Sequence, residues 1–287
     1  MSPQPHPDRY AVLGNPVAHS RSPFIHAAFA RQTGQHIDYG RVLCPLEGFA
    51  AALQEFATGG DGRARGCNVT LPFKFEALRL AARCSERAAL AGAANTLRFD
   101  AAGWFADNTD GVGLVRDIEL NAGVALAGRR VLRVGAGGAG AGVLGPLLAA
   151  QPAEVVLANR TADKAHRLVE RHAAVAQAQG VQLSAGGLEN PGAAYDVVIN
   201  ASASSLHGRA SPVPATTLAP GALAVDLMYG AAAEPFLAWA REAGASARDG
   251  LGMLVEQAAE SFTLWRAVRP LTAQVLQALR ASLAATP

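Results

Sequence analysis

The sequence predicts a two-domain α/β protein, and three observations support this prediction. The chain has 287 residues, a length typical of two domains or one large one. Strand-like apolar runs alternate with helix-like runs along the whole chain, which is typical of parallel α/β architecture. Near the middle, a strand, a glycine-rich turn and a helix follow one another at residues 131–150. We therefore expect a second domain to begin close to that turn.

Local patterns place the elements of the first half. Short apolar runs predict strands at residues 10–13, 37–43 and 66–70. The intervening segments predict helices at residues 23–32 and 49–57. A further helix follows the third strand. Two runs separated by Asp100-Ala-Ala predict a hairpin, with strands at residues 94–99 and 103–106.

The second half repeats the alternation. A helix over residues 110–121 leads into the second domain, whose expected strands are 130–134, 154–158, 196–200 and 222–227. The segment from Leu251 has apolar residues at helical spacing, including Phe262 and Trp265. We expect this last segment to pack back on the first domain.

Charge and composition exclude several classes of protein. Half of the residues are hydrophobic, 17% are charged and the net charge is +2, so neither nucleic acid nor a membrane surface is the expected partner. No apolar run is long enough to span a bilayer, and the first eight residues do not resemble a signal peptide. The three cysteines and seven histidines show neither disulfide nor metal-ligand spacing. We expect a soluble cytoplasmic protein without a metal; monomer and homodimer both stay open.

The segment Asn68-Val-Thr-Leu-Pro-Phe-Lys74 is the most informative stretch of the chain. Asn68 and Thr70 end a strand and point to the same side. Pro72 is expected as the first residue of a helix, which places Lys74 in the first turn, near the positive end of the helix dipole. The dipole there favours a neutral amine, as a proton-transfer group requires. The alternative is a surface lysine beside a strand–helix junction.

The glycine-rich turn predicts a dinucleotide site. Gly135-Ala-Gly137-Gly138-Ala-Gly140 follows a strand and precedes a helix-like segment at residues 141–150. Glycines let backbone amides approach a pyrophosphate at such a turn. Pro146 argues against a straight helix, and a purely structural turn is the alternative.

The end of the next strand favours NADP over NAD. An NAD site usually has an acidic residue there to accept from the ribose 2′-hydroxyl. This chain has Asn159-Arg160-Thr161 instead, with Lys164 one helical turn later. A guanidinium suits a 2′-phosphate. The alternative is a solvated Arg160 with Thr161 as a helix cap.

Arg133 does not fit its surroundings. It lies within a strand that should be buried on both faces. Such an arginine either extends to the edge of the sheet or meets an acidic partner. The sequence does not decide between these two explanations.

A second set of polar residues lies at element ends in the first domain. Ser22 is expected to cap the helix that follows it, with Pro23 as the first helical residue. The hydroxyls of Ser20 and Ser22 would also suit a carboxylate at a helix N-terminus. Asn95 and Asp110 add an amide and a carboxylate; Asp110 is either a helix cap or the partner of Lys74.

Several motifs, in the same order along the chain, resemble those of the shikimate dehydrogenases. They span residues 10 to the C-terminal helix: Asn15-Pro-Val-Ala-His-Ser20-Arg-Ser22-Pro, Asn68-Val-Thr-Leu-Pro-Phe-Lys74, Ala93-Ala-Asn95-Thr, Asp107-Asn-Thr-Asp110-Gly, Gly135-Ala-Gly-Gly-Ala, Asn159-Arg-Thr and Asp249-Gly-Leu-Gly-Met-Leu-Val-Glu-Gln257. The resemblance implies NADPH-dependent reduction of 3-dehydroshikimate to shikimate, a step towards aromatic amino acids. It also implies an N-terminal α/β substrate domain, residues 1–110 completed by 250–287, and a Rossmann-like NADP-binding domain, residues 111–249.

The resemblance also assigns residues to roles. Lys74 and Asp110 would be the catalytic pair. The substrate-binding residues would be Ser20, Ser22, Asn68, Thr70, Lys74, Asn95, Asp110, Tyr229 and Gln257. The cofactor-binding residues would be Gly135, Ala136, Gly137, Gly138, Ala139, Asn159, Arg160, Thr161, Lys164, Ser202, Met228 and Gly250.

The chain departs from the family pattern at three places. Phe75 follows the motif lysine where an acidic residue is common, Ser202 replaces a usual threonine, and Gly140 adds flexibility to the glycine turn. Two other functions stay possible: an NAD-dependent quinate/shikimate dehydrogenase and a non-catalytic dinucleotide-sensing protein. Arg160 argues against the first, and the presence of both Lys74 and Asp110 argues against the second.

Overall fold

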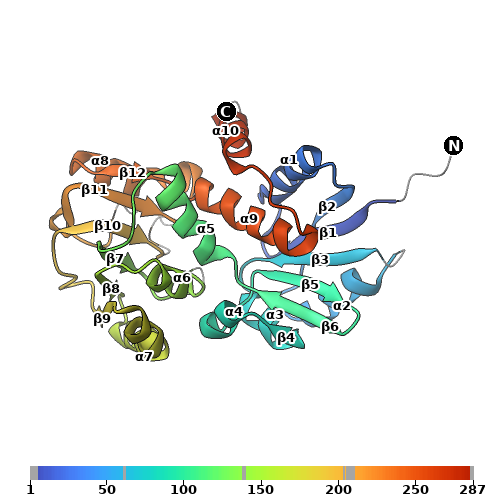
Figure 1. Cartoon of the computed structure of the whole chain (residues 1–287), viewed down its shortest axis with the longest axis horizontal. Coiled ribbons are helices and arrows are strands. Elements are labelled where there is room, and N and C mark those ends of the chain that lie inside the picture. The colour runs from blue at the N-terminus through green and yellow to red at the C-terminus, as the bar shows by residue number, and fades with distance from the viewer. Residues whose placement is uncertain (1–5, 61–62, 138–139, 203, 205–210, 285–287) are drawn as a thin grey trace. The chain divides into compact units, whose positions relative to one another are not determined.

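The chain folds into two compact units. The structure, a computed structural model, describes residues 6–60, 63–137, 140–202, 204 and 211–284. The first unit comprises Met1–Asp110 and Val255–Pro287, and the second comprises Gly111–Leu254. Each unit is built on its own six-stranded sheet (Figure 1).

The sheet of the first unit has the strand order β2-β1-β3-β5-β6-β4. Its strands are β1 (Asp8–Gly14), β2 (Ile37–Leu43), β3 (Ala64–Val69), β4 (Arg83–Cys84), β5 (Thr96–Asp100) and β6 (Gly103–Asp107). Strands β1, β2 and β3 are parallel, as expected. The predicted hairpin forms from β5 and β6, and β5 runs antiparallel to β3 as well. The sheet is therefore mixed: the predicted hairpin supplies its antiparallel part, because a short turn reverses the chain, and the other pairings are parallel.

Helices cover both faces of this sheet. They are α1 (Ser22–Thr33), α2 (Phe49–Thr58), α3 (Lys74–Leu80), α4 (Glu86–Ala91), α10 (Thr272–Ala284) and, from Val255 onward, α9 (Leu251–Arg266). Alternate residues of β1 face opposite ways, as the pleat requires: Leu13 packs with the residues of α2 and α3, whereas Tyr10 packs with Trp265 of α9. The sheet thus lies between two helical layers.

The C-terminal segment packs on the first unit, as the sequence predicts. The Trp265 indole donates a hydrogen bond to the Leu97 carbonyl at 2.9 Å, and the rings of Phe29 and Phe262 meet edge to face.

The predicted start of α3 is wrong: the helix begins at Lys74, and Pro72 lies in the preceding turn. The Phe73 amide closes that turn on the Thr70 carbonyl before the helix can start.

The second unit contains a wholly parallel sheet with the order β12-β11-β10-β7-β8-β9. Its strands are β7 (Arg130–Val134), β8 (Glu154–Ala158), β9 (Gln182–Gly186), β10 (Tyr195–Asn200), β11 (Leu218–Asp226) and β12 (Ser246–Arg248). Numbered from the first strand of this unit, the order is 3-2-1-4-5-6, which is the order of dinucleotide-binding α/β domains. The order reverses between β7 and β10, where such domains bind their ligand.

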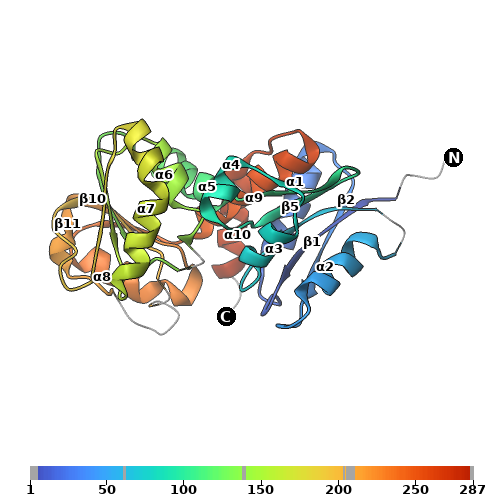
Figure 2. The same cartoon turned by 90° about the horizontal axis from the view of Figure 1, so that it is seen from below.

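Helices surround this second sheet. They are α5 (Asp110–Arg116), which continues into a π-helical turn at Asp117–Asn121, α6 (Leu144–Ala149), α7 (Ala162–Gln179) and α8 (Glu234–Glu242). Helices α6 and α7 lie side by side (Figure 2), over a core that includes Val131, Leu157 and Ile199. The regular part of α6 is shorter than the expected residues 141–150. Pro146 is its third residue, a position where a proline removes no internal hydrogen bond.

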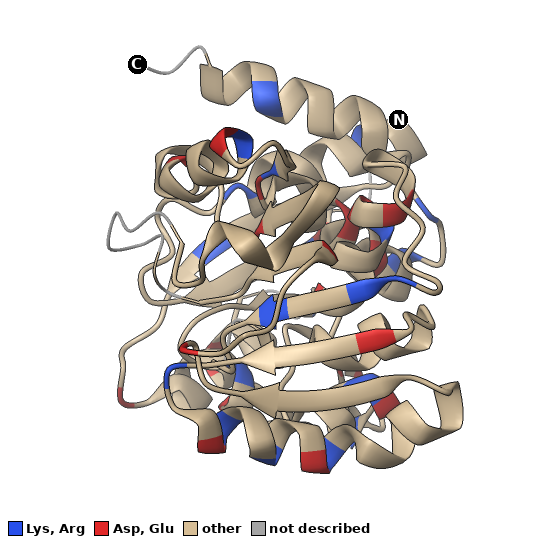
Figure 3. Ribbon diagram, turned by 90° about the vertical axis from the view of Figure 1, so that its left-hand side faces the viewer, with Lys and Arg blue, Asp and Glu red and all other residues tan. Residues whose placement is uncertain are grey.

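Positive and negative residues are interspersed over the ribbon in Figure 3, in line with the balanced composition. In the part of the chain that the structure describes, no helix has both the length and the apolar character needed to cross a bilayer.

Candidate active site

Lys74 and Asp110 form an ion pair within the first unit. Lys74 is the first residue of α3, directly after the β3–α3 turn, and Asp110 is the first residue of α5. The Lys74 Nζ donates to Asp110 Oδ2 at 2.6 Å, and the two side chains are only 14% and 8% exposed. The Ala94 amide donates to the Lys74 carbonyl, so the start of α3 is also tied to the segment that carries Asn95. The structure thus shows a contact between Lys74 and Asp110 that their spacing in the sequence could not predict.

Asn95 holds the other oxygen of the Asp110 carboxylate. Its Nδ2 donates to Asp110 Oδ1 at 2.8 Å and also lies within hydrogen-bond distance of Thr109 Oγ1 and Gln257 Oε1. The Asn95 Oδ1 accepts from the Thr109 backbone amide at 2.9 Å. Asp110 is therefore oriented at both oxygens, by an amine on one side and an amide on the other.

Asn68 lies deeper in the same network. Its Nδ2 reaches the Asn95 carbonyl, Thr96 Oγ1 and Ser261 Oγ at 3.1–3.2 Å, and its Oδ1 accepts from the Tyr39 hydroxyl at 2.7 Å. Both ends of the amide are thus engaged by the protein itself. Thr70 differs, because it is half-buried and its hydroxyl has no polar partner among the described residues.

Ser20 and Ser22 lie together at the start of α1, with their hydroxyls 3.2 Å apart. The expectation that Ser22 caps this helix is wrong. Arg21 occupies the cap position without a side-chain bond, and the Ser20 hydroxyl accepts from the Ser22 amide at 3.3 Å. Arg41 of β2, which the sequence did not single out, donates twice to the Ser20 carbonyl, at 2.6 and 3.1 Å. Two hydroxyls beside a guanidinium suit a carboxylate ligand.

An ion pair fixes the loop that leads to Asp110. Arg87 of α4 donates to both oxygens of Asp107, which also accept from the Ser85 hydroxyl and the Asn108 amide. Burial pushes the pKa of Asp107 upward, but the bonds and charge of Arg87 outweigh it and hold the pKa below its ordinary value. The Asn108 side chain in turn accepts from the Asp110 amide.

In the second unit, the glycine turn after β7 is built around close backbone contacts. Gly135 has φ 104°, and a Cβ there would lie 2.8 Å from the backbone of Ala201 and Ser202. The Ala136 amide donates to Asn159 Oδ1 at 3.0 Å, which ties the turn to the end of β8. A Cβ on Gly137, in contrast, would meet no atom within 4 Å among the described residues other than its chain neighbours. Gly138 and Ala139 lie outside the described residues.

The residues expected at the 2′-phosphate lie together at the start of α7. Arg160, Thr161 and Lys164 are exposed, and no described residue offers a polar partner to the side chain of Arg160 or Lys164. Thr161 occupies the cap position of α7 but makes no side-chain capping bond, so its alternative role as a helix cap is wrong. The exposed guanidinium and amine form a small cationic area beside the glycine turn's anchor, Asn159.

The other expected cofactor residues follow β10, β11 and β12. The Ser202 hydroxyl donates to Asn200 Oδ1 at 2.7 Å. The Gly250 amide donates to the Met228 carbonyl at 2.8 Å, and a Cβ on Gly250 would lie 2.3 Å from the Leu227 carbonyl oxygen. Only a glycine fits there. Tyr229 is half-buried and belongs to this second unit, and its expected role in substrate binding stays a prediction.

The described residues contain no group of three or more His, Cys, Asp or Glu side chains that could hold a metal ion.

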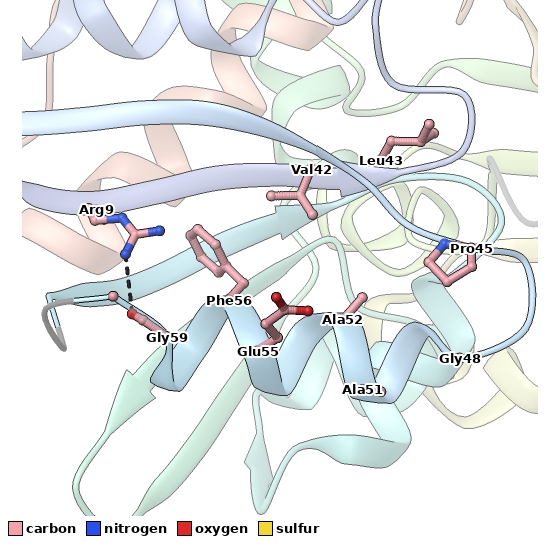
Figure 4. Close-up of a pocket in the computed structure, with 11 residues that line it drawn as sticks. Arg9, Val42, Leu43, Pro45, Gly48, Ala51, Ala52, Glu55, Phe56 and Gly59 are labelled. Carbon is pink, nitrogen blue, oxygen red and sulfur yellow. Dashed lines mark hydrogen bonds between the residues drawn. The ribbon is translucent and has the colours of Figure 1, made fainter.

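An open pocket of about 610 Å³ lies between the end of β2 and α2 (Figure 4). Arg9, which lies over the Phe56 ring and donates to the Gly59 carbonyl, forms one end of it. None of its lining residues belongs to the candidate site.

Two features define the class of this protein. The strand order of the second unit is that of dinucleotide-binding domains, and the first unit contains a buried lysine–carboxylate pair of the kind used in proton transfer. Comparison with known proteins narrows this class. Residues 12–97 match the family described as the shikimate dehydrogenase substrate binding domain. Residues 118–209 match the shikimate / quinate 5-dehydrogenase family, and residues 250–280 match the shikimate 5′-dehydrogenase C-terminal domain.

Individual relatives agree with these matches. A shikimate dehydrogenase (NADP(+)) of Methylibium petroleiphilum is 66% identical over 96% of this chain and 94% of its own length. The crystal structure of an Ael1 enzyme from Pseudomonas putida is 46% identical, with a TM-score of 0.87, and covers 95% and 98% of the two chains. Shikimate 5-dehydrogenase from Thermus thermophilus, in complex with NADP(H) and shikimate, is 32% identical, with a TM-score of 0.80 and coverage of 96% and 99%. The chain therefore belongs to the shikimate dehydrogenase family, which confirms the resemblance of its motifs.

Proposed function

We propose that this protein catalyses the reversible NADPH-dependent reduction of 3-dehydroshikimate to shikimate, a step of the shikimate pathway towards aromatic amino acids. The observation that carries the proposal is the ion pair of Lys74 and Asp110, at 2.6 Å, in a chain with the family's two domains. A proton donor oriented by a carboxylate is what carbonyl reduction requires of the protein.

The residues of the second unit fit NADP. A Cβ on Gly137 would meet no described atom within 4 Å apart from its chain neighbours, which supports a diphosphate at this turn. The turn also follows β7, beside the point where the strand order reverses and where such domains bind their ligand. Arg160 offers a guanidinium without a partner among the described residues for the 2′-phosphate, where an NAD site would have an acidic residue. When bound, NADPH supplies the hydride for the reduction. Ala136, Asn159, Thr161, Lys164, Ser202, Met228 and Gly250 would complete the site.

Lys74 is the general acid in the proposed reduction. Its amine donates a proton to the substrate carbonyl oxygen, and in the oxidation of shikimate it accepts the proton of the same hydroxyl. Asp110 holds the amine through Oδ2, and Asn95 fixes the carboxylate through Oδ1. General acid–base assistance of this kind is typically worth ~10²–10⁴-fold in rate.

Polar groups around this pair would bind the substrate. Ser20 and Ser22, with Arg41 behind them, suit the ring carboxylate. Thr70 and Gln257 would bind ring hydroxyls. The Asn68 amide already bonds to Tyr39, Thr96 and Ser261, so a substrate hydroxyl would have to share these hydrogen-bonding atoms. Its chief contribution is therefore to hold Asn95 in place, through the Asn95 carbonyl.

A comparison of two cofactors and two substrates tests the proposal. We expect oxidation of shikimate with NADP⁺ to have a higher kcat/KM than oxidation with NAD⁺, and shikimate to be a better substrate than quinate. An Arg160→Leu variant should lose the preference for NADP⁺, because the 2′-phosphate loses its partner. Preference for NAD⁺ or quinate would favour the quinate/shikimate enzyme instead. Cofactor binding without oxidation of either substrate would favour a dinucleotide-sensing protein.

A further inference from the structure

Arg133 is a buried arginine in the middle of the nucleotide-binding unit. It is the fourth residue of β7 and pairs in register with Leu157 of β8 and Ile199 of β10, both apolar. Its exposed fraction is 0%, and Nε, Nη1 and Nη2 all lack a hydrogen-bond partner among the described residues. Neither explanation offered by the sequence holds, because the side chain neither reaches solvent nor meets a described acid.

Such a group is costly to bury. Burial lowers the pKa of the Arg133 guanidinium to about 10, so it stays charged at neutral pH. The nearby buried His172 does not balance the charge. Burial lowers the pKa of His172, the Leu168 carbonyl opposes this shift, and the Arg133 charge lowers the pKa further. A buried charge without a counter-charge is strongly unfavourable, so an anion that approached Arg133 would be bound more tightly.

The position of the guanidinium shows where that anion would be. A Cβ on Gly140 would lie 2.0 Å from Arg133 Nη2 and 3.2 Å from the Ala201 Cβ. The head of Arg133 therefore lies directly beneath Gly140, between the chain that leaves β7 and the chain that leaves β10. The strand order reverses there, and domains with this strand order bind their nucleotide outside that point. A Cβ at position 140 would displace the Arg133 guanidinium, so the glycine leaves room for it.

We propose that Arg133 is the buried counter-charge for the cofactor diphosphate. It acts from beneath the turn at Gly140, through the low dielectric of the protein interior, and does not itself touch the cofactor. It is thus a positioning residue for the NADP site, and its assignment rests on the proposed function. The diphosphate supplies the negative charge that the described part of the protein does not.

The affinities of the ligand-free protein for two probe molecules distinguish this role of Arg133 from a purely structural one. NADP⁺ carries both the diphosphate and the 2′-phosphate, whereas adenosine 2′-monophosphate carries only the latter. We expect Arg133→Met to weaken NADP⁺ binding by roughly tenfold or more in calorimetry and to change adenosine 2′-monophosphate binding by less than about twofold. Arg133→Lys, which keeps the charge, should restore part of the NADP⁺ affinity. The matched control, Arg160→Met, should weaken both probes.

Thermal unfolding adds a second readout. Removing an unpaired buried charge should leave the Tm of ligand-free Arg133→Met equal to or above that of the wild type, while the rise in Tm on adding NADP⁺ shrinks. Wild-type affinity of Arg133→Met for NADP⁺, equal loss of both probes, or a variant too unstable to fold would each overturn the proposal. A wild-type protein that binds no NADP⁺ would instead refute the proposed function.

Discussion

Lys74 differs in kind from nearly every other cation of this protein. Of the 25 basic residues only two are lysines, Lys74 and Lys164; all the others are arginines. An arginine cannot release its proton in a protein, whereas a lysine amine can donate one and take it back. Asp110 and Asn95 fix the direction in which that amine points. Lys74 is therefore the cation that we propose for proton transfer.

His26 gives the substrate-binding unit a defined pH dependence. Its ring stacks on Tyr39 with centroids 4.2 Å apart, and burial lowers its pKa from 6.5 to about 3, although the nearby Asn68 acts in the opposite direction. Neither ring nitrogen has a hydrogen-bond partner among the residues described. The unfolded chain takes up the proton near pH 6.5, and the folded protein only near pH 3. The stability that neutral His26 contributes is therefore complete above pH 6.5 and is lost as the pH falls towards 3.

Denaturant unfolding at pH 7 and pH 4.5 measures this contribution. The wild type should lose roughly 2–3 kcal/mol more of its free energy of unfolding over that interval than His26→Phe does. The substitution keeps the stack on Tyr39 and removes the titrating group, so other titrations cancel in the difference. Equal losses in the two proteins would show that His26 is not the buried neutral group described here.

Single residues show what the sequence could and could not predict. Lys74, Asp110 and Asn95 were identified from motifs, because their chemistry is unusual for their positions. Tyr39 and Ser261, which bond to Asn68 in the same network, were not. Their side chains are ordinary for a strand and a helix, and Ser261 reaches the network only because the C-terminal helix packs on the first unit.

At the scale of elements, the glycine turn after β7 contains two glycines with different tasks. Gly135 has φ 104°, and a Cβ there would clash with the backbone after β10, whereas a Cβ on Gly137 would meet no described atom within 4 Å apart from its chain neighbours. Gly135→Ala should therefore lower the stability of the protein by a few kcal/mol, through strain and the clash with Ala201. Gly137→Ala should fold as well as the wild type but bind NADP⁺ about tenfold or more weakly, because the methyl group occupies the space left for the diphosphate.

Melting curves and NADP⁺ titrations of the two variants check this pair. Unchanged stability in Gly135→Ala would contradict the proposed close contact. Unchanged NADP⁺ affinity in Gly137→Ala would mean that the cofactor does not approach this part of the turn.

Elements with a strong apolar period were predictable, and the others were not. The strands β1, β2, β3, β7, β8, β10 and β11 follow from short runs rich in valine, isoleucine, leucine or tyrosine. β9 was missed because Gln182–Gly186 is polar and half-exposed, and β4 and β12 because they have only two and three residues. The hairpin of β5 and β6 was predicted from its turn, but the pairing of β5 with β3 was not, because α3 and α4 separate these two strands along the chain.

At the scale of the whole molecule, the chain separates its chemistry into two units. The side-chain hydrogen bonds that join Lys74, Asp110 and Asn95 lie within the first unit, and the glycine turn, Arg133 and Arg160 belong to the second. The sequence predicted this two-part architecture because the glycine turn marks the start of a second strand–helix alternation. It could not predict the return of residues 255–287 in detail, which depends on long-range packing such as that of Trp265 on Leu97.

The turnover of Lys74→Ala tests the central claim most directly. With saturating shikimate and NADP⁺, we expect kcat to fall by ~10²–10⁴-fold, because the proton loses its acceptor. The affinity for NADP⁺ should stay near that of the wild type, because Lys74 lies in the other unit. Lys164→Ala, the only other lysine variant the chain offers, should weaken NADP⁺ binding and leave kcat at saturating cofactor nearly unchanged. A near-normal kcat in Lys74→Ala would contradict the assignment of Lys74 as the acid–base group.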